Sequence, residues 1–442
     1  MHVRSLTLKN IRGFRSLTWE PDDAFAGWHV ILGSNGSGKS SLLRAFALAL
    51  VGPKEGLAMR EAWADWLSSG AGQGDIDAWV SMSYRHDRVA GKGRRLENSP
   101  VPACVQLVRG SGEVKPEAPR FVVGHSKRVF DGDRYMWSGN RGWFSAGFGP
   151  MRRFRGGDRD QERLYFTNPR LARHLTLFGE DVALTEALTW LKQLRFEALE
   201  AEERGESEGG EPGKLLKKLT AFVNQEGFLR HGVRLDSVTS KDVLFVDGNG
   251  LKLSVDRLSD GFRSILSLTF ELIRQLAQCY GADQIFDPED PTRVVVPGVV
   301  LIDEVDAHLH ASWQREIGFF FTRHFPEIQF IVATHSPLVC QAAVSGSIFR
   351  LAPPGTGEAS RMVSEDEYNR LVYGNVLDAY GTASFGITAG GRSDEARVKL
   401  RRLAELAEKE FEEGLSKEEK RELEALRGLL PTAATSVVDK SA

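Results

Sequence analysis

A glycine-rich octapeptide near the N-terminus constrains the fold of this chain more than any other feature. Residues 33–40 read GSNGSGKS and match the pattern G-x-x-x-x-G-K-[ST]. An apolar run at 28–32 precedes them, and apolar residues recur at helical spacing through 40–50. The order predicts a buried strand, a tight loop and a helix. In such a loop the backbone N–H groups and the helix N-terminus surround a phosphate.

The side chains of this phosphate loop predict a bound nucleotide with Mg²⁺. Lys39 is expected to reach the β- and γ-phosphates, and the Ser40 hydroxyl is expected to ligate Mg²⁺. The predicted nucleotide-binding residues of the loop are Gly33, Ser34, Asn35, Gly36, Ser37, Gly38, Lys39, Ser40 and Ser41.

A pair of carboxylates follows a second buried strand. Residues 299–304 read VVLIDE, four apolar residues and then Asp303 and Glu304. A carboxylate at the end of a strand beside the phosphate loop can hold Mg²⁺, and the next one can orient and deprotonate a water molecule. We therefore expect Asp303 to support Mg²⁺ and Glu304 to act as the general base.

Two further segments gain meaning from their order in the chain. LSDGFRS at 258–264 opens a predicted helix about 40 residues before the acidic strand, and Ser259 with the free N–H groups at that helix start can hold a phosphate. THSP at 334–337 follows the next buried strand. His335 is placed there to contact the γ-phosphate and sense hydrolysis.

In this order the segments resemble the ABC-type ATPase superfamily, and within it the RecF/SMC/OLD-like branch. LKNIRGF at 8–14, LIDEVDAHLH at 301–310 and ATHSP at 333–337 add to the resemblance, which covers 1–50 and 255–340. In that family two heads associate head to tail around ATP.

The resemblance implies composite sites made by two copies of the chain, with ATP and Mg²⁺ as cofactors. Lys39, Glu304 and the switch histidine His335 would act on the nucleotide of their own copy. Ser259 and Gly261 would complete the site of the partner copy. Asp306 would lie in the loop that communicates across the dimer.

The sequence departs from the family pattern at a few positions. Asp260 and Phe262 replace the second glycine and the glutamine of the transporter signature, and Ala311 replaces a proline that many relatives have. A glutamine usually follows an early strand in this family; Gln73 and Gln106 are the two candidates, and the sequence does not separate them.

The pattern of apolar segments predicts the fold class and the domains. Continuous apolar strands that alternate with helices indicate an α/β protein with a mostly parallel sheet. We expect an ABC-type ATPase head with a mostly parallel central sheet, an antiparallel N-terminal sheet and a largely helical inserted middle region. The predicted boundaries are 1–52 and 251–355 for the two lobes of the head, 53–250 for the middle region and 356–442 for a helical tail.

Composition narrows the class of protein. The net charge of −3 gives no global attraction to nucleic acid, and three widely spaced cysteines argue against a disulfide framework or a zinc site. No apolar run approaches the length of a membrane span, so we expect a cytoplasmic protein without membrane contact. His308 and His310 alternate at the start of a predicted helix, where they do not share a face, so we do not expect a metal site there.

The stretch 142–155, GWFSAGFGPMRRFR, combines aromatic residues with arginines. It could bind nucleic acid by charge and stacking. It also resembles a G-[YF]-G-P-x-R stretch of OLD-like ATPases that lack coiled coils, for which a structural or nucleotide-adjacent role is equally open.

The remaining features favour a regulatory ATPase. No heptad pattern of a coiled-coil arm is sustained, and no D-x-D pair of a TOPRIM nuclease follows Pro337. The chain thus resembles the ATPase subunits of anti-phage defence systems such as Septu, retron-linked Septu and PARIS. In these, a dimer or larger assembly controls a separate effector, a nuclease or toxin. The alternatives are a RecF-like repair ATPase that clamps DNA when ATP closes the dimer, and a transporter ATPase.

Overall fold

The structure is a computed structural model. It describes residues 1–22, 25–59, 61–83, 86–87, 100–110, 113–119, 121–123, 128–130, 132, 136–137, 143–150, 152, 168–179, 185–386 and 393–430. The chain divides into two compact units, 1–376 and 377–442.

A mostly parallel sheet forms the centre of the first unit. Its strand order is β16-β15-β3-β14-β13-β9, in which only β16 runs antiparallel to its neighbour. The strands are β3 (Gly27–Leu32), β9 (Ser145–Phe148), β13 (Gly298–Ile302), β14 (Ile328–Thr334), β15 (Gly346–Arg350) and β16 (Arg361–Met362). Every residue of β3, β13 and β14 is buried, because helices and a second sheet cover both faces. The predicted fold class is confirmed in this sheet.

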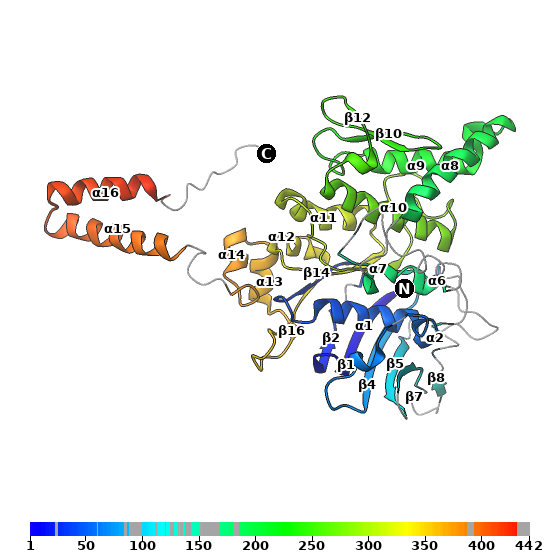
Figure 1. The fold of residues 1–442 in the computed structure, drawn as a ribbon, viewed down its shortest axis with the longest axis horizontal. Coiled ribbons are helices and arrows are strands. Elements are labelled where there is room, and N and C mark those ends of the chain that lie inside the picture. Colours follow the sequence, from blue (N-terminus) through cyan, green and yellow to red (C-terminus); the bar gives the residue numbers. More distant parts are fainter. Residues whose placement is uncertain are drawn as a thin grey trace. The chain divides into compact units, whose positions relative to one another are not determined.

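A five-stranded antiparallel sheet is the second layer, as expected for the N-terminal part. Its order is β2-β1-β4-β5-β6. The strands are β1 (His2–Ile11), β2 (Phe14–Trp19), β4 (Gln73–Ser81), β5 (Val101–Arg109) and β6 (Val114–Glu117). Figure 1 shows β1, β2, β4 and β5 gathered beside α1.

Helix α1 (Lys39–Val51) lies between the two sheets. It contacts β4 and β5 of the antiparallel sheet and β9, β13 and β14 of the parallel sheet. Nearly all of its residues are buried, including Leu42, Phe46 and Leu50, and alanines at 45, 47 and 49 allow close approach. A helix that is apolar all round must be covered all round. The phosphate loop at its N-terminus is therefore anchored in the core.

The middle region is less helical than the sequence suggested. Within 53–250 the described residues contain strands β4 to β11 as well as helices, so this region is mixed rather than largely helical. Strand β4 pairs with β1 and strand β9 pairs with β13, both from the flanking segments. The reason is that these pairings join distant parts of the chain, which local periodicity does not reveal. The division at 52, 250 and 355 stays a prediction.

The other elements of 53–254 include a helical pair that packs on a small sheet. Helices α8 and α9 contact each other and strands β10 and β11, and Figure 1 shows α8, α9, β10 and β12 together. The elements are α2 (Pro53–Gly56), η1 (Trp63–Trp66), β7 (Phe121–Val123), β8 (Arg128–Phe130), α6 (Pro169–Ala172), α7 (Leu175–Phe178), α8 (Thr185–Glu203), η2 (Ser207–Gly209), α9 (Gly210–Asn224), β10 (Arg234–Val238), β11 (Val243–Val246) and β12 (Lys252–Ser254).

The segment after 254 supplies the remaining helices of the first unit. They are η3 (Val255–Arg257), α10 (Asp260–Tyr280), α11 (Ala311–His324), α12 (Pro337–Cys340), η4 (Ala343–Ser345) and α13 (Glu365–Val372), followed by α14 (Val376–Tyr380) at the boundary. None of the helices in the described ranges is long and apolar enough to span a bilayer.

The second unit contains a helical hairpin of α15 (Asp394–Glu412) and α16 (Lys417–Leu429). The capping box of Ser416 and Glu419 that starts α16 is present. Leu406 and Leu423 are the buried residues of the two helices, and Arg402 donates to both carboxylate oxygens of Glu422, each at 2.9 Å.

Candidate nucleotide site

The phosphate loop adopts a conformation that its glycines permit. Gly38 caps α1 with φ 97°, in the left-handed region that favours glycine. A Cβ on Gly38 would lie 2.6 Å from Cζ of Phe14, and a Cβ on Gly33 would lie 2.3 Å from Oγ of Ser37. Phe14 is the last residue of the segment LKNIRGF (8–14), here called the NIRGF segment, so this segment packs directly against the loop. The first N–H groups of α1 have no intrahelical acceptor.

Lys39 lies inside the loop. Its ammonium donates to the carbonyl oxygens of Gly33 at 2.8 Å and Ser34 at 3.1 Å, and it lies 3.5 Å from Nδ1 of His335. Burial lowers the pKa of Lys39, while the carboxylates of the segment 303–306 oppose that shift. The structure thus places the predicted phosphate lysine, the acidic residues and the predicted switch histidine within one electrostatic environment.

The two carboxylates at the end of β13 have different surroundings. Asp303 is 3% exposed, and its Oδ1 has no hydrogen-bond partner within the described part of the chain. Glu304 is exposed and has φ 45°. A buried carboxylate oxygen without a partner is costly, and carboxylate oxygens are the ligands that Mg²⁺ prefers. The donor set of Asp303 and Ser40 therefore fits Mg²⁺, and the exposed Glu304 is accessible to water.

The residues 303–306, here called the acidic turn, are joined to the end of β14. The Thr334 hydroxyl donates to the Asp306 carboxylate at 2.5 Å and accepts from the N–H of Ser336 at 2.9 Å. Burial, followed by the nearby Lys39 charge, lowers the pKa of His335. The imidazole is therefore neutral at pH 7, so that one ring nitrogen donates and the other accepts.

The signature segment, residues 258–264, is exposed at Ser259 and Asp260. Ser259 is exposed and precedes α10 without a capping bond from its side chain. A Cβ on Gly261 would lie 3.1 Å from the carbonyl oxygen of His308, so this glycine packs beside the loop that contains Asp306. Its neighbours Asp260 and Arg263 form an ion pair with each other. The Ser259 hydroxyl is thus accessible to a second molecule.

The stretch 142–155 contributes a residue to the site that sequence reasoning did not assign to it. Trp143, Phe144 and Phe148 are buried, so these rings are not accessible for stacking on bases. Arg152 is also buried, and its guanidinium donates to the backbone carbonyls of Asp303 at 2.9 Å and Glu304 at 3.0 Å. Residues 142, 151 and 153–155 lie outside the described residues. The available signal was the G-F-G-P-x-R pattern.

Neither glutamine candidate lies at the edge of the parallel sheet. Gln73 is in β4 and Gln106 is in β5, and both donate to the carboxylate of Asp75 at 2.9 Å within the antiparallel sheet. The strand that flanks β13 on the side away from β14 is β9, and Gly149, Pro150 and Arg152 follow it. That position next to the acidic turn is therefore occupied without a glutamine.

Residues 308–310, with the sequence HLH, lead directly into helix α11. His310 is its N-cap and accepts from the N–H of Ser312, so a histidine replaces the proline-based helix entry at Ala311. Among the described residues no group of three or more His, Cys, Asp and Glu could hold a metal ion. The expectation that His308 and His310 form no metal site stays a prediction.

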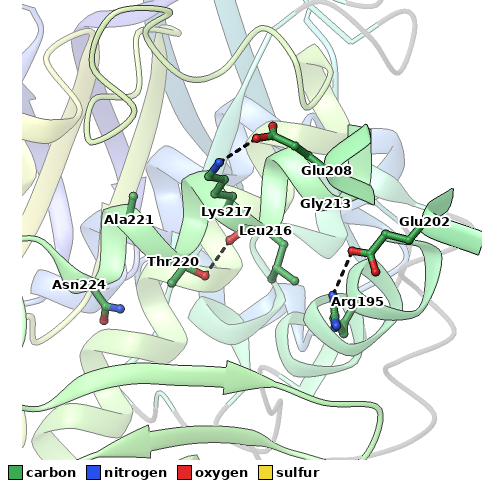
Figure 2. A pocket seen from close by; sticks show the side chains of 9 residues that line it. All are labelled: Arg195, Glu202, Glu208, Gly213, Leu216, Lys217, Thr220, Ala221 and Asn224. Carbon is green, nitrogen blue, oxygen red and sulfur yellow. Dashed lines mark hydrogen bonds and ion pairs between the residues drawn. The ribbon is translucent and has the colours of Figure 1, made fainter. Parts of the chain in front are cut away.

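A surface pocket of about 460 Å³ between α8 and α9 is separate from these motifs (Figure 2). Its charged side chains pair with each other, Lys217 with Glu208 at 2.9 Å and Arg195 with Glu202 at 3.7 Å. The Thr220 hydroxyl donates within α9. The polar groups of this pocket are therefore engaged with neighbours.

Comparisons with known proteins agree with the motifs. The family described as "AAA domain, putative AbiEii toxin, Type IV TA system" matches residues 168–341, and a family described as "AAA domain" matches residues 5–91. Together these ranges contain the phosphate loop, the signature segment, the acidic turn and His335.

Two relatives point in the same direction. The "Retron Ec83 probable ATPase" of Escherichia coli is 34% identical over 36% of this chain and 33% of its own length. The "Septu protein PtuA" of Bacillus mycoides is 25% identical over 78% of this chain and 40% of its own length. The SMC head domain of Thermotoga maritima has a TM-score of 0.40 and 16% identity over 82% of this chain and 98% of its own.

The chain spans about a third of the length of the retron relative and 40% of the Septu relative. Within that span, the predicted resemblance is confirmed: this chain carries an ATPase-type domain similar to a probable ATPase of a retron and to a Septu protein.

Proposed function

We propose that this chain binds and hydrolyses ATP at two composite sites formed by two copies that associate head to tail. The observation that carries the proposal is an asymmetry within one chain. Lys39, the acidic turn and His335 lie together, whereas Ser259 at the start of α10 is exposed and forms no capping bond. A helix start of this kind can hold a phosphate presented by a second molecule.

Each described group then has a chemical role in hydrolysis. The N–H groups at the start of α1 and the Lys39 ammonium hold the β- and γ-phosphates. Mg²⁺, when bound by Ser40 and Asp303, would neutralise charge on the phosphate oxygens. The Glu304 carboxylate orients a water molecule and takes its proton. His335, neutral at pH 7, contacts the γ-phosphate.

Three variants test the composite site. Lys39→Ala is expected to abolish nucleotide binding. Glu304→Gln keeps the side-chain volume, so binding should remain while hydrolysis falls roughly 10²- to 10⁴-fold. In Ser259→Arg, each copy is expected to bind ATP as before, but two copies should no longer associate when ATP is added. The measurements are titration with a fluorescent ATP analogue, phosphate release, and the mass of the particle by light scattering with and without ATP.

The results separate the parts of the proposal. An ATP-dependent doubling of mass in Glu304→Gln that is lost on adding Ser259→Arg supports the head-to-tail dimer. A Glu304→Gln protein that hydrolyses ATP at the normal rate would remove this residue from the role of general base. Hydrolysis by a monomer that is insensitive to Ser259→Arg would refute the composite site.

The dimer is further proposed to control a separate effector, a nuclease or toxin, in bacterial defence against phage. The support is the similarity to retron and Septu proteins and the toxin named in the family description. Affinity purification from the native host should yield a second protein in a fixed ratio. Unchanged phage protection in a Lys39→Ala strain would refute the defence role. A protein that purifies alone and binds DNA only with ATP would favour a RecF-like clamp.

A further inference from the structure

Arg152 is buried between two segments that are distant in the sequence, the acidic turn and helix α10. It is 6% exposed. Its Nη1 donates to the carbonyls of Gly149 at 3.0 Å and Asp303 at 2.9 Å, and its Nη2 donates to that of Glu304 at 3.0 Å. Its Nε donates to the hydroxyl of Ser264 at 3.1 Å. One guanidinium thus binds the acidic turn on one side and helix α10 on the other.

The charge of Arg152 depends on the acidic turn. Its hydrogen-bond acceptors among the described residues are neutral, and burial lowers the pKa of the guanidinium to about 10. The carboxylates of Asp306, Asp303 and Glu304 oppose that shift. The group therefore remains cationic at neutral pH. A planar fork with five donors suits this arrangement of carbonyls, which the compact ammonium of a lysine cannot bridge.

The hydrogen bonds of Arg152 to the acidic turn lie on either side of Glu304, whose backbone conformation is unfavourable by itself. Glu304 has φ 45°, a left-handed conformation that costs a residue with a Cβ. Such a conformation persists where the surroundings fix it. Arg152 holds the carbonyl groups of Asp303 and Glu304, the peptide units on either side of the Glu304 Cα. It thereby determines the direction in which the Glu304 side chain leaves the turn.

The other end of the network lies near the signature segment. Ser264 is on the first turns of α10, which begins at Asp260 directly after Ser259. In a head-to-tail dimer, which is the function proposed above, Ser259 serves the nucleotide of the partner, whereas Glu304 serves the nucleotide of its own copy. Arg152 therefore connects elements of two different composite sites.

We propose that Arg152 is a positioning residue that orients Glu304 and fixes its turn to the start of α10, so that nucleotide engagement at one composite site sets the general base of the other. This inference rests on the proposed function.

The test uses two serines of the same helix. Ser264→Ala removes the hydroxyl that accepts from Arg152. Ser267→Ala, the matched control, removes a buried hydroxyl that donates to the carbonyl of Ser264 and does not contact the guanidinium. Ser264→Ala is expected to lower kcat about 10-fold, the effect of losing a hydrogen bond to a charged group. The KM for ATP and the binding of an ATP analogue should change less than about twofold, and Ser267→Ala should leave kcat within about twofold.

A double variant shows whether Ser264 acts through the guanidinium. Arg152→Gln should lower kcat about 100-fold or more, and Arg152→Lys should restore little of it. Adding Ser264→Ala to Arg152→Gln should then cause no further loss, because residues of one network are not additive. Equal kcat in Ser264→Ala and Ser267→Ala, or a full further 10-fold loss in the double variant, would overturn the inference.

Hydrogen exchange provides a measurement that needs no nucleotide. The amide of Val305 donates to Ala333 at 3.1 Å and that of Ala307 donates to Glu304 at 2.9 Å, so both report on the turn. They should exchange faster in Ser264→Ala than in Ser267→Ala. Equal exchange would show that Arg152 does not hold the turn. A wild-type protein that binds no ATP would instead refute the proposed function and leave the exchange result to decide this inference.

Discussion

Replacing Gly38 by alanine tests how the NIRGF segment and the phosphate loop depend on each other. Gly38 has φ 97°, and a Cβ there would lie 2.6, 3.2 and 3.3 Å from three ring carbons of Phe14. Carbon atoms pack best at about 3.5–4.0 Å. The alanine methyl therefore meets two penalties at once, the left-handed backbone and the aromatic ring.

The two penalties can be given magnitudes. A left-handed conformation costs a residue with a Cβ about 1–2 kcal/mol. Forcing an extra methyl into a packed position costs about 1–3 kcal/mol. Gly38→Ala should thus reduce the free energy of unfolding by about 2–5 kcal/mol, since both penalties add. Gly36 offers a matched comparison, because its φ is 77° and its nearest neighbour, Cγ of Pro354, lies 3.9 Å from the ideal Cβ. Gly36→Ala should cost only the backbone part, about 1–2 kcal/mol.

The assay is urea denaturation of the nucleotide-free protein, followed by tryptophan fluorescence. Gly38→Ala is first compared with Gly36→Ala. The cost of Gly38→Ala is then measured a second time in a protein that already carries Phe14→Ala. Without the ring, the cost of the alanine should fall to about 1–2 kcal/mol, the backbone part alone. Gly13, next to Phe14, serves as the neutral control, because apart from its chain neighbours no atom of the described residues lies within 4 Å of its ideal Cβ. The reasoning is refuted if Gly38→Ala costs no more than Gly36→Ala, or if its cost is the same with and without the Phe14 ring.

Three other predictions concern stability. Burial lowers the pKa of His29 to about 4 and that of His174 to about 3; the unfolded state then binds more protons below pH 6.5, so stability should fall from pH 6.5 toward 4, and equal urea midpoints at pH 7 and 5 would contradict this. Thr334→Val keeps the volume but removes the bond to the Asp306 carboxylate, so the free energy of unfolding should fall by about 1.5–3 kcal/mol, and an unchanged value would show the bond is dispensable. Ser416→Ala removes the cap of α16 and should raise hydrogen exchange along that helix by the equivalent of about 1 kcal/mol, with α15 less affected; exchange that stays at the wild-type rate would argue against the cap.

Several elements follow directly from the sequence because their determinants are local. The strand–loop–helix order at 28–50 is set by an apolar run, glycines and helical spacing within about 20 residues. The acidic strand and the strand before His335 are likewise short apolar runs, and both are found as β13 and β14. The helix predicted to open at the segment 258–264 is found as α10. The assignment of chemical roles to these residues stays a prediction that the variants above test.

Other features were decided by contacts between distant parts of the chain. Strand β4 joins the N-terminal sheet by pairing with β1, and the residues of β1 that pair with it lie more than 60 positions away. The middle region therefore could not be recognised as strand-rich from periodicity. The positive φ of Glu304 also has no signature in the residues around it.

Arg152 shows the division most clearly. In the sequence it is one of several arginines among aromatic residues, a pattern that favours nucleic acid as much as a structural role. In the fold it lies between Ser264, 112 positions away, and Asp303, 151 positions away. The sequence by itself determined the phosphate loop and the order of the motifs, because each motif carries its own chemistry within a few residues. Only the tertiary structure decided what the guanidinium binds, because a buried cation is placed by the carbonyl and hydroxyl groups that remote segments bring around it.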